Sequence, residues 1–259
     1  HQEARRQRQM CIRDSRKPDV SPGTLMDDVE RRDFTVNSLL LDVVSGDILD
    51  LTGMGIQDIR SGVVRTPLDP DVIFREDPLR MLRAIRFTVK FDWDLPLFMI
   101  RAIRKNHKML ETISFERIRD ELVKMIMTDR PDDAIRLLKV TKLIDHVIPG
   151  LTDLIGIEQG KHHHLDAFDH TLLVLKNTPK DVIVRVAAIL HDIGKSKTKT
   201  GSGDDVHFFE HDNVGSKMAE EIARRLVFSL KEINSIKSLV FHHMRTKSFG
   251  NFAENVGNK

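Results

Sequence analysis

The sequence predicts a mostly α-helical protein with a small α+β unit toward its N-terminal end. From Pro78 onward, apolar residues recur at spacings of three and four in one segment after another, which is typical of helices that bury one face. Before that, apolar segments 39–44 and 48–51 flank Ser45, Gly46 and Asp47, the pattern of a β-hairpin. Two short strands are marginal without partners, so this unit holds too little sheet to stand alone.

Composition places the chain among globular proteins. Its 259 residues, 40% of them hydrophobic, suffice for one large domain or two to three small ones. The net charge of +2 gives no argument for nucleic acid by itself, and an aromatic content of 5% argues against a large stacking platform. Cys11 is the only cysteine, and neither a membrane span nor a signal peptide is evident, so we expect a cytoplasmic protein without membrane contact. The oligomeric state is not predicted.

Residues 1–20 are polar and arginine-rich, and they show no apolar periodicity. We expect a basic tail rather than a folded segment, and two interpretations stay open. The segment is a non-native or mis-joined extension, or it is a disordered basic arm that contacts nucleic acid.

The segment 75–87, REDPLRMLRAIRF, predicts a helix with two distinct faces. Asp77 is placed as the N-cap and Pro78 at the first helical position. One buried stripe follows at spacings of three, three and four: Leu79, Leu82, Ile85 and Val89.

The other face of this helix carries Glu76, Arg80 and Arg83. A carboxylate beside planar guanidinium groups, close to a helix N-terminus, can hold a polar planar ligand or a phosphate. On these residues alone the simpler interpretation is favoured, in which Asp77 only caps the helix and the arginines are solvated partners of their neighbours.

Three more helices with N-terminal signals are expected before a domain boundary near Pro149 and Gly150. They cover 96–106, 114–127 and 131–141.

Beyond that boundary the chain again predicts helices. Residues 182–190 are apolar all round, which predicts a buried central helix that Gly194 stops. Two further helices are expected from His211 to Leu226 and from Lys231 to His243.

Five side chains of this C-terminal region suggest a metal site. Four histidines lie near helix ends in four different helices, and an aspartate directly follows one of them: His170, His191, Asp192, His211 and His243. Neutral imidazoles and a carboxylate at the ends of packed helices make a site of mixed nitrogen and oxygen ligands. A single histidine would more often be a satisfied core residue, but the set favours metal binding.

The motifs that carry these residues, FDHT, HDIGK, FFEHDNVG and LVFHHM, resemble those of the HD-domain metal-dependent phosphohydrolases over about residues 160–245. The resemblance implies that His170, His191 and Asp192 are metal ligands and that His211 and His243 complete the site. The family pattern ends in a further aspartate, and this sequence has none after Asp212.

A second series of motifs covers residues 30–124. In order, ERRDFTVNSL, DLTGMGIQDI, REDPLRMLRAIRF and ISFERIRDELVK resemble motifs of the class II tRNA nucleotidyltransferases that build the 3′-terminal CCA, and of the related bacterial poly(A) polymerases. The resemblance implies a partial α+β nucleotidyltransferase head, a helical neck and an all-α HD domain.

The same resemblance assigns residues to the nucleotide. Asp77 and Arg80 would present a Watson–Crick-like edge to the incoming base, since a carboxylate accepts from an exocyclic amine and a guanidinium donates to ring or carbonyl acceptors. The ribose and phosphates would be held by four residues with support from two more: Arg31, Arg32, Asp33 and Asn37, with Arg83 and Arg86.

Nucleotidyl transfer needs carboxylates that hold metal ions. The family places them in an Asp-x-Asp strand motif that follows a Gly-Gly-x-x-Arg-Asp loop, and this sequence has neither before ERRDFT. Asp27 and Asp28 are adjacent, so in a strand they would point to opposite faces. We therefore expect a fragment of such an enzyme that holds no catalytic residue and adds no nucleotides.

The implied parent activity is addition of CCA, or part of it, to the tRNA 3′ end from CTP and ATP, with Mg²⁺ for transfer and a divalent transition metal in the HD site. Whether CCA, only A or only CC is added stays open. Two alternatives remain, namely an HD-type phosphohydrolase or cyclic phosphodiesterase and a helical RNA- or nucleotide-binding module. The expected parts are a tail, the C-terminal part of the head, the neck that binds nucleotide and RNA, and a truncated HD domain: 1–20, 21–75, 76–150 and 151–259.

Overall fold

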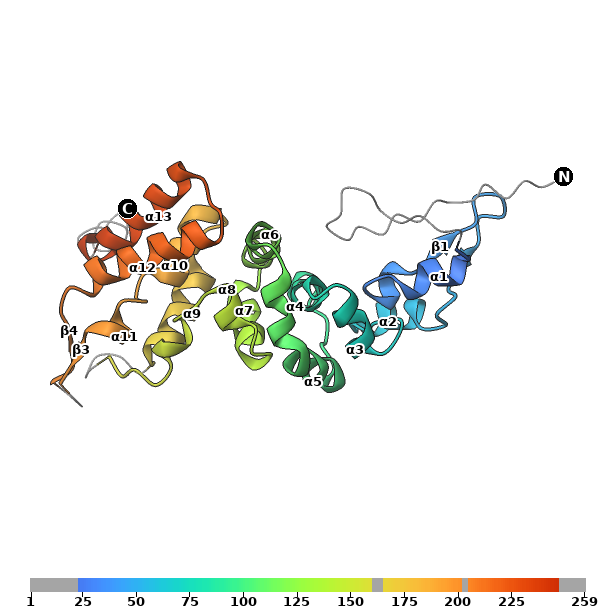
Figure 1. Ribbon diagram of the computed structural model, residues 1–259, viewed down its shortest axis with the longest axis horizontal. Helices are drawn as coiled ribbons and strands as arrows, with labels where there is room; N and C mark the ends of the chain where they lie inside the picture. Colours follow the sequence, from blue (N-terminus) through green and yellow to red (C-terminus); the bar gives the residue numbers. More distant parts are fainter. Residues whose placement is uncertain (1–22, 160–164, 202–204, 247–259) are drawn as a thin grey trace, which may run out of the picture.

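The computed structural model describes residues 23–159, 165–201 and 205–246, and the predicted basic tail lies outside them. The elements follow one another along an elongated, mostly helical molecule, from α1 and the β1–β2 hairpin at one end to α9–α13 at the other (Figure 1). This confirms the predicted mostly-α fold. Within the described part of the chain, no helix has the length and apolar character that crossing a membrane would need.

The N-terminal unit holds the predicted hairpin. Its elements are α1 (Leu25–Glu30), the 3₁₀ turn η1 (Thr35–Asn37), β1 (Leu40–Leu41), β2 (Ile48–Leu49) and α2 (Gly55–Ser61). The hairpin is confirmed, with Leu40 opposite Leu49, but its strands are shorter than predicted. The reason is Asp42, whose carboxylate accepts from the backbone N–H groups of Val44 and Ser45 and so turns residues 42–47 into a loop.

The segment 75–87 divides between two helices, α3 (Pro70–Glu76) and α4 (Leu79–Phe91), and α3 was not predicted. Asp77 ends α3, and its carboxylate accepts from the N–H of Leu79 at 3.1 Å, so it also caps α4. Pro78 has helical angles but stands one residue before α4. The placement of Glu76 on the same helix as Arg80 was therefore wrong.

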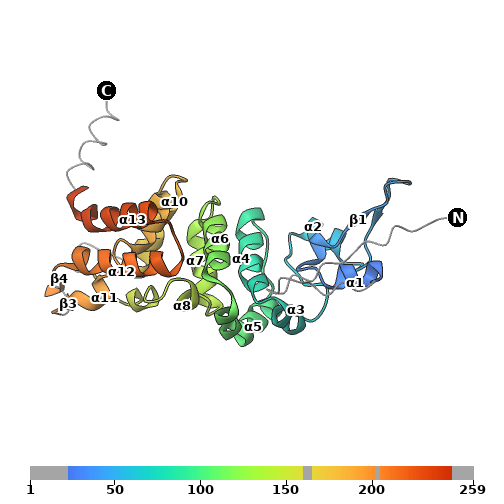
Figure 2. The ribbon, with the colours of Figure 1, turned by 45° about the horizontal axis from the view of Figure 1, so that its top comes forward.

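The core face of α4 was predicted correctly. All four residues of the predicted stripe are buried, and Met81, Ala84 and Thr88 widen it. The stripe packs against the helices that follow, chiefly α6 and α7, so α4 stands between them and the N-terminal unit (Figure 2).

The three further helices of the middle region are confirmed within a residue at each end. They are α5 (Leu97–Asn106), α6 (Phe115–Ile126) and α7 (Pro131–Val140), joined and followed by the short turns η2 (His107–Thr112), α8 (Ile144–Val147) and η3 (Thr152–Leu154). Gly150 takes a left-handed φ of 82° at the predicted boundary, which favours glycine. The domain limits themselves stay predictions.

The C-terminal region is a helical bundle around α10. Its elements are α9 (Ala167–Asn177), α10 (Val182–Leu190), α11 (Lys195–Thr198), β3 (Lys199–Thr200), β4 (His207–Phe208), α12 (His211–Arg225), α13 (Leu230–His242) and η5 (His243–Thr246). Helix α10 packs against α9, α12 and α13, as a central helix should. Helix α10 is not buried on every side, however, because Val184 is 37% exposed. Arg185, the one charged residue of this helix, is only 4% exposed.

Candidate functional site

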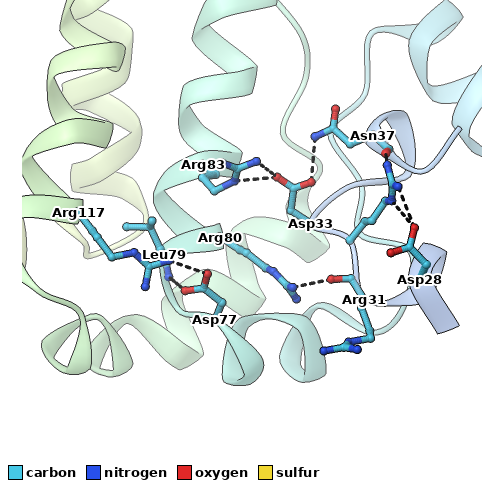
Figure 3. A pocket seen from close by; sticks show the side chains of 10 residues that line it. Asp28, Arg31, Asp33, Asn37, Asp77, Leu79, Arg80, Arg83 and Arg117 are labelled. Atoms are coloured by element: carbon cyan, nitrogen blue, oxygen red, sulfur yellow. Dashed lines mark hydrogen bonds and ion pairs between the residues drawn. The ribbon is translucent and has the colours of Figure 1, made fainter. Parts of the chain in front are cut away.

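A cavity of about 650 Å³ lies where α1 and η1 meet the start of α4 (Figure 3). Seven of the eight residues that we predicted to bind nucleotide line it: Arg31, Arg32, Asp33, Asn37, Asp77, Arg80 and Arg83. The lining also includes Asp28, Leu79 and Arg117, which were not predicted to bind nucleotide. Segments that are about 50 residues apart in the sequence thus form one polar pocket.

The centre of the pocket is an ion pair between the two segments. Asp33 is buried, and its Oδ2 accepts from Nε of Arg83 at 2.7 Å and also from Nη2 of that residue. Its Oδ1 accepts from the Asn37 side chain and from the N–H of Phe34, both at 2.9 Å. Asp33 therefore fixes the guanidinium of Arg83 rather than facing the cavity as an unpaired charge.

Arg32 and Arg80 are also oriented by their neighbours. Arg32 donates to the Asp28 carboxylate at 2.8 Å and to the carbonyl of Asn37 at 2.7 Å. Arg80 donates to the Glu76 carboxylate at 2.7 Å and to the carbonyl of Arg31 at 2.5 Å. Charge-assisted bonds of this kind hold planar donors in fixed directions.

Asp77 is held from the far side of the pocket. Nη2 of Arg117, on α6, donates to its Oδ2 at 3.0 Å, while the N–H of Leu79 binds Oδ1. A carboxylate has about four lone-pair sites, so Asp77 keeps acceptor capacity toward the cavity. Arg117 lies inside the motif ISFERIRDELVK, and that motif was the signal that could have identified it.

Arg86 is the predicted nucleotide residue that does not line the cavity. Its Nε donates at 2.6 Å to the carboxylate of Glu121, which is 2% exposed and also accepts from Lys124 at 3.1 Å. This contact ties α4 to α6. Arg86 therefore supports the helix that carries Arg80 and Arg83.

The pocket lining is positive overall. Five arginines and three aspartates line it, and each aspartate is paired with one arginine. The excess of guanidinium groups suits a polyphosphate, which accepts bidentate hydrogen bonds from arginine.

The five residues of the predicted metal site come together in the C-terminal bundle. Asp192 is 2% exposed, and its carboxylate lies 3.1–3.7 Å from the Nε2 atoms of all four histidines: His170, His191, His211 and His243. The Nε2 atoms of His211 and His243 are 3.2 Å apart. Two groups of three ligand atoms, sharing Asp192, lie close enough to hold a metal ion.

Three of the imidazoles are fixed by the helix ends on which they lie. Nδ1 bonds a backbone carbonyl in His191, His211 and His243, at 2.8, 2.7 and 2.6 Å. A carbonyl only accepts, so each Nδ1 carries a proton, and in the neutral ring the Nε2 lone pair faces Asp192. Lone pairs that converge on a carboxylate require a cation between them, so the donor set fits a divalent metal ion.

The neighbours of Asp192 keep its carboxyl group in the charged form. Burial alone would raise the pKa of Asp192, but hydrogen bonds from His191 and His243 and the charge of Lys195 hold it well below its ordinary value. Burial lowers the pKa of His211, which favours its neutral, metal-binding form.

Gly194 does not stop α10, contrary to the prediction, because the helix already ends at Leu190. The φ of Gly194 is −67°, and this residue lies directly against the start of α12. A Cβ there would meet the carbonyl of His211 and would lie 2.6 Å from the backbone N of Gly215. The glycine is needed for this close helix approach, which places His211 beside Asp192.

We expect Gly194→Ala to lower the free energy of unfolding by about 1–3 kcal/mol, the usual cost of overpacking, and to weaken metal binding by displacing His211. Ser196→Ala, two residues further on, is the matched control and should change neither property. Thermal unfolding of both variants checks this, and an unchanged midpoint for Gly194→Ala would contradict the close-packing argument.

Three family models match the chain in the order of its parts. Residues 2–65 match the poly A polymerase head domain, residues 99–155 match the probable RNA and SrmB-binding site of polymerase A, and residues 162–252 match the HD domain. Poly A polymerase and HD motifs were the two resemblances drawn from the sequence.

Curated relatives include tRNA nucleotidyltransferases of different specificity. The A-adding tRNA nucleotidyltransferase of Deinococcus radiodurans is 32% identical over 235 residues, which cover 86% of this chain and 53% of the relative. The CC-adding tRNA nucleotidyltransferase of Thermus thermophilus is 29% identical over 234 residues, with the same two coverages of 86% and 53%. The chain thus spans about half the length of these curated relatives.

Solved structures share the fold. A CCA-adding enzyme in its apo form I superimposes with a TM-score of 0.56 at 23% identity, over 87% of this chain and 49% of that one. In chain order, the matched segments are a poly A polymerase head, an RNA-binding segment and an HD domain. The chain combines the head, RNA-binding and HD segments of the class II CCA-adding enzymes, which confirms the resemblance drawn from its motifs.

Proposed function

We propose that this chain takes part in adding the 3′-terminal CCA, or part of it, to tRNA from CTP and ATP. The observation that carries the proposal is the pocket, which gathers seven of eight predicted nucleotide-binding residues from two distant segments. Relatives named A-adding and CC-adding both match the chain, so the proposal covers the class of reaction and not the nucleotides added.

Asp77 and Arg80 are the pair proposed to recognise the base. They lie at the break between α3 and α4, and both line the cavity. Cytosine and adenine each combine an exocyclic amine donor with a ring-nitrogen acceptor, so a carboxylate beside a guanidinium suits both. Arg117 and Glu76 orient the two side chains, which reduces the entropy lost when a base binds.

The remaining pocket residues are proposed to hold the ribose and the triphosphate. Arg83 is fixed by Asp33, and Arg32 by Asp28, so their remaining N–H donors have defined directions. Asn37 is fixed by Asp33 and stands at the ribose end of this array in the proposed binding mode.

The residues of this pocket do not offer free carboxylate ligands to the metal ions that nucleotidyl transfer needs. The nucleotidyltransferase and HD families are metal-dependent, but the carboxylates of Asp28, Asp33 and Asp77 are each held by an arginine. A metal ion would have to displace these arginines, so the pocket fits a nucleotide and not a Mg²⁺ pair. We therefore assign no transfer step to its residues and expect no primer extension by this chain alone.

Nucleotide binding tests the proposal. Asp77→Asn should weaken binding of CTP and ATP roughly 5- to 100-fold, the range of one bidentate base contact, and should reduce the preference for them over UTP and GTP. Arg80→Met should have a similar effect. The matched control is Asp133→Asn, since Asp133 pairs with Arg130 at 2.7 Å outside the pocket.

Equilibrium titration of each variant with the four nucleotides gives the result. The base-recognition proposal would be overturned if Asp77→Asn bound each of the four nucleotides with the same affinity as the unchanged chain. RNA binding with a steep salt dependence, in the absence of any nucleotide binding, would favour the helical RNA-binding module instead.

A second function is supported at the HD site, where four imidazoles converge on Asp192. We propose that these five residues hold a divalent transition metal, which in the bound state would act as a Lewis acid on a phosphate ester and activate water. Lys195 donates to Asp192 at 2.7 Å and to Gln159 at 2.6 Å, so it fixes the shared carboxylate. If the site is a phosphohydrolase, we expect the chain to hydrolyse a cyclic nucleotide in the presence of the metal. The Asp192→Ala variant should lose this activity.

A further inference from the structure

Aromatic residues are scarce in this chain, at 5%, yet four of them form a single row beside the pocket. The ring centroids of Phe34 and Phe87 are 5.3 Å apart, those of Phe87 and Phe91 are 5.6 Å apart, and those of Phe91 and Trp93 are 4.9 Å apart. These separations are within the range of ring packing.

The row continues the face of α4 that lines the pocket. Arg80, Arg83, Phe87 and Phe91 follow one another at spacings of three, four and four, so they share one side of the helix. The first two line the cavity, and the other two extend from it toward the C-terminal end of α4.

The row passes from the core to the surface. Phe34 has no exposed surface, Phe87 is half-buried, and Phe91 is 43% exposed. Phe34 belongs to the core, and the rings of Phe87 and Trp93 pack against it. The exposed ring of Phe91 is not explained by the core.

Cationic side chains lie close to Phe87 and Phe91. Nζ of Lys90 lies 4.9 Å from the centroid of Phe91, and the Arg86 guanidinium lies 4.8 Å from that of Phe87. Lys90 is exposed and forms no ion pair within residues 23–159, 165–201 and 205–246. Exposed aromatic rings beside cations are the elements with which proteins bind single-stranded nucleic acid.

We propose that the single-stranded 3′ end of an RNA lies along this face of α4, with one base stacked on Phe91 and the adjoining phosphates near Lys90. The inference rests on the proposed function, to which it adds residues that would guide the primer to the nucleotide pocket. The row adjoins the pocket, since the guanidinium of Arg83 lies 6.0 Å from the ring centroid of Phe87, and the charge of Lys90 beside Phe91 is complementary to a phosphate. A protein ligand would use the apolar ring but would have no need of the cations.

Trp93 makes the proposal measurable, because it is the only tryptophan of the chain and its ring contacts Phe91. The probes are an RNA hairpin with a short single-stranded 3′ tail and the same hairpin with a blunt end. The tailed RNA should quench the Trp93 fluorescence and bind more tightly than the blunt one. Quenching by both RNAs alike would overturn the proposal.

Variants of Phe91 identify the stacking contribution. Phe91→Leu keeps an apolar side chain and should bind the tailed RNA at least about fivefold more weakly, whereas Phe91→Tyr keeps the aromatic face and should bind it normally. The control is Phe98→Leu, since Phe98 is also 43% exposed and lies 5.7 Å from the Arg65 guanidinium, but on α5. It should leave the affinity for the tailed RNA unchanged.

The outcomes separate this inference from the proposed function. If the unchanged chain binds the tailed RNA and Phe91→Leu binds it equally well, the stacking proposal alone is wrong. If the unchanged chain binds neither RNA, both the stacking proposal and the proposed function fail.

Discussion

His243→Ala should bind Co²⁺ at least about 100-fold more weakly than the unchanged chain, whereas His242→Ala should bind it normally. His243 lies 3.6 Å from the Asp192 carboxylate and 3.2 Å from the Nε2 of His211, within the cluster. Changes that only affect the partners of metal ligands already cost about 10- to 100-fold in affinity, and loss of a ligand should cost at least as much.

The two histidines form a matched pair. His242 is the last residue of α13, is exposed, and bonds the carbonyl of Ser238 at 2.9 Å, away from Asp192. Titration of each protein with Co²⁺, followed by visible absorption and by calorimetry, measures the affinity. Equal affinities for His243→Ala and His242→Ala would show that the cluster does not hold the metal.

The gathering of four histidines around Asp192 was predictable because its signal is local. Each histidine lies at or near the end of a helix with clear apolar periodicity, and His191 and Asp192 are adjacent in the sequence. What the sequence could not provide is which ring nitrogen of each histidine faces Asp192. The bonds from Nδ1 to carbonyls three residues earlier depend on the backbone geometry at the helix ends.

Most residues that line the pocket were predicted from motifs, but several of its contacts were not. The capping pattern that was assigned to Asp77 and Pro78 also occurs at Asp69 and Pro70, where the Asp69 side chain accepts from the N–H of Asp71 and α3 begins. That second Asp-Pro pair was the signal that could have revealed α3. The link from Arg117 to Asp77 spans 40 residues, so no local pattern reveals it.

Arg185 is the residue whose structural role was least visible in the sequence. It is the one charged residue in the apolar segment 182–190, and helical periodicity gives no reason for a buried guanidinium there. Its partners are the carbonyls of Ile126 and Thr128 at the C-terminal end of α6, and those of Thr178 and Pro179 before α10. It therefore joins the middle helices to the C-terminal bundle.

Arg185→Met should lower the free energy of unfolding by about 3 kcal/mol, because these buried carbonyls would lose a charged donor and gain no other partner. Burial lowers the pKa of Arg185, as expected for a guanidinium that has lost its water, yet the group stays charged at neutral pH. Lysine cannot reach several carbonyls at once, so Arg185→Lys should recover only part of the loss. Arg224→Met, which removes an exposed pair with Glu220 on α12, is the control and should leave the unfolding midpoint unchanged.

The measurement is unfolding by denaturant, observed at two places in the same sample. Trp93 fluorescence reports the unfolding of the region around α4, while circular dichroism reports all helices. In the unchanged chain, the bonds of Arg185 couple the two regions, so both signals should change together. In Arg185→Met they should separate, with the circular dichroism showing an additional transition at lower denaturant. Coincident transitions at the original midpoint would mean that the packing of α7 against α9 is enough to couple the regions without Arg185.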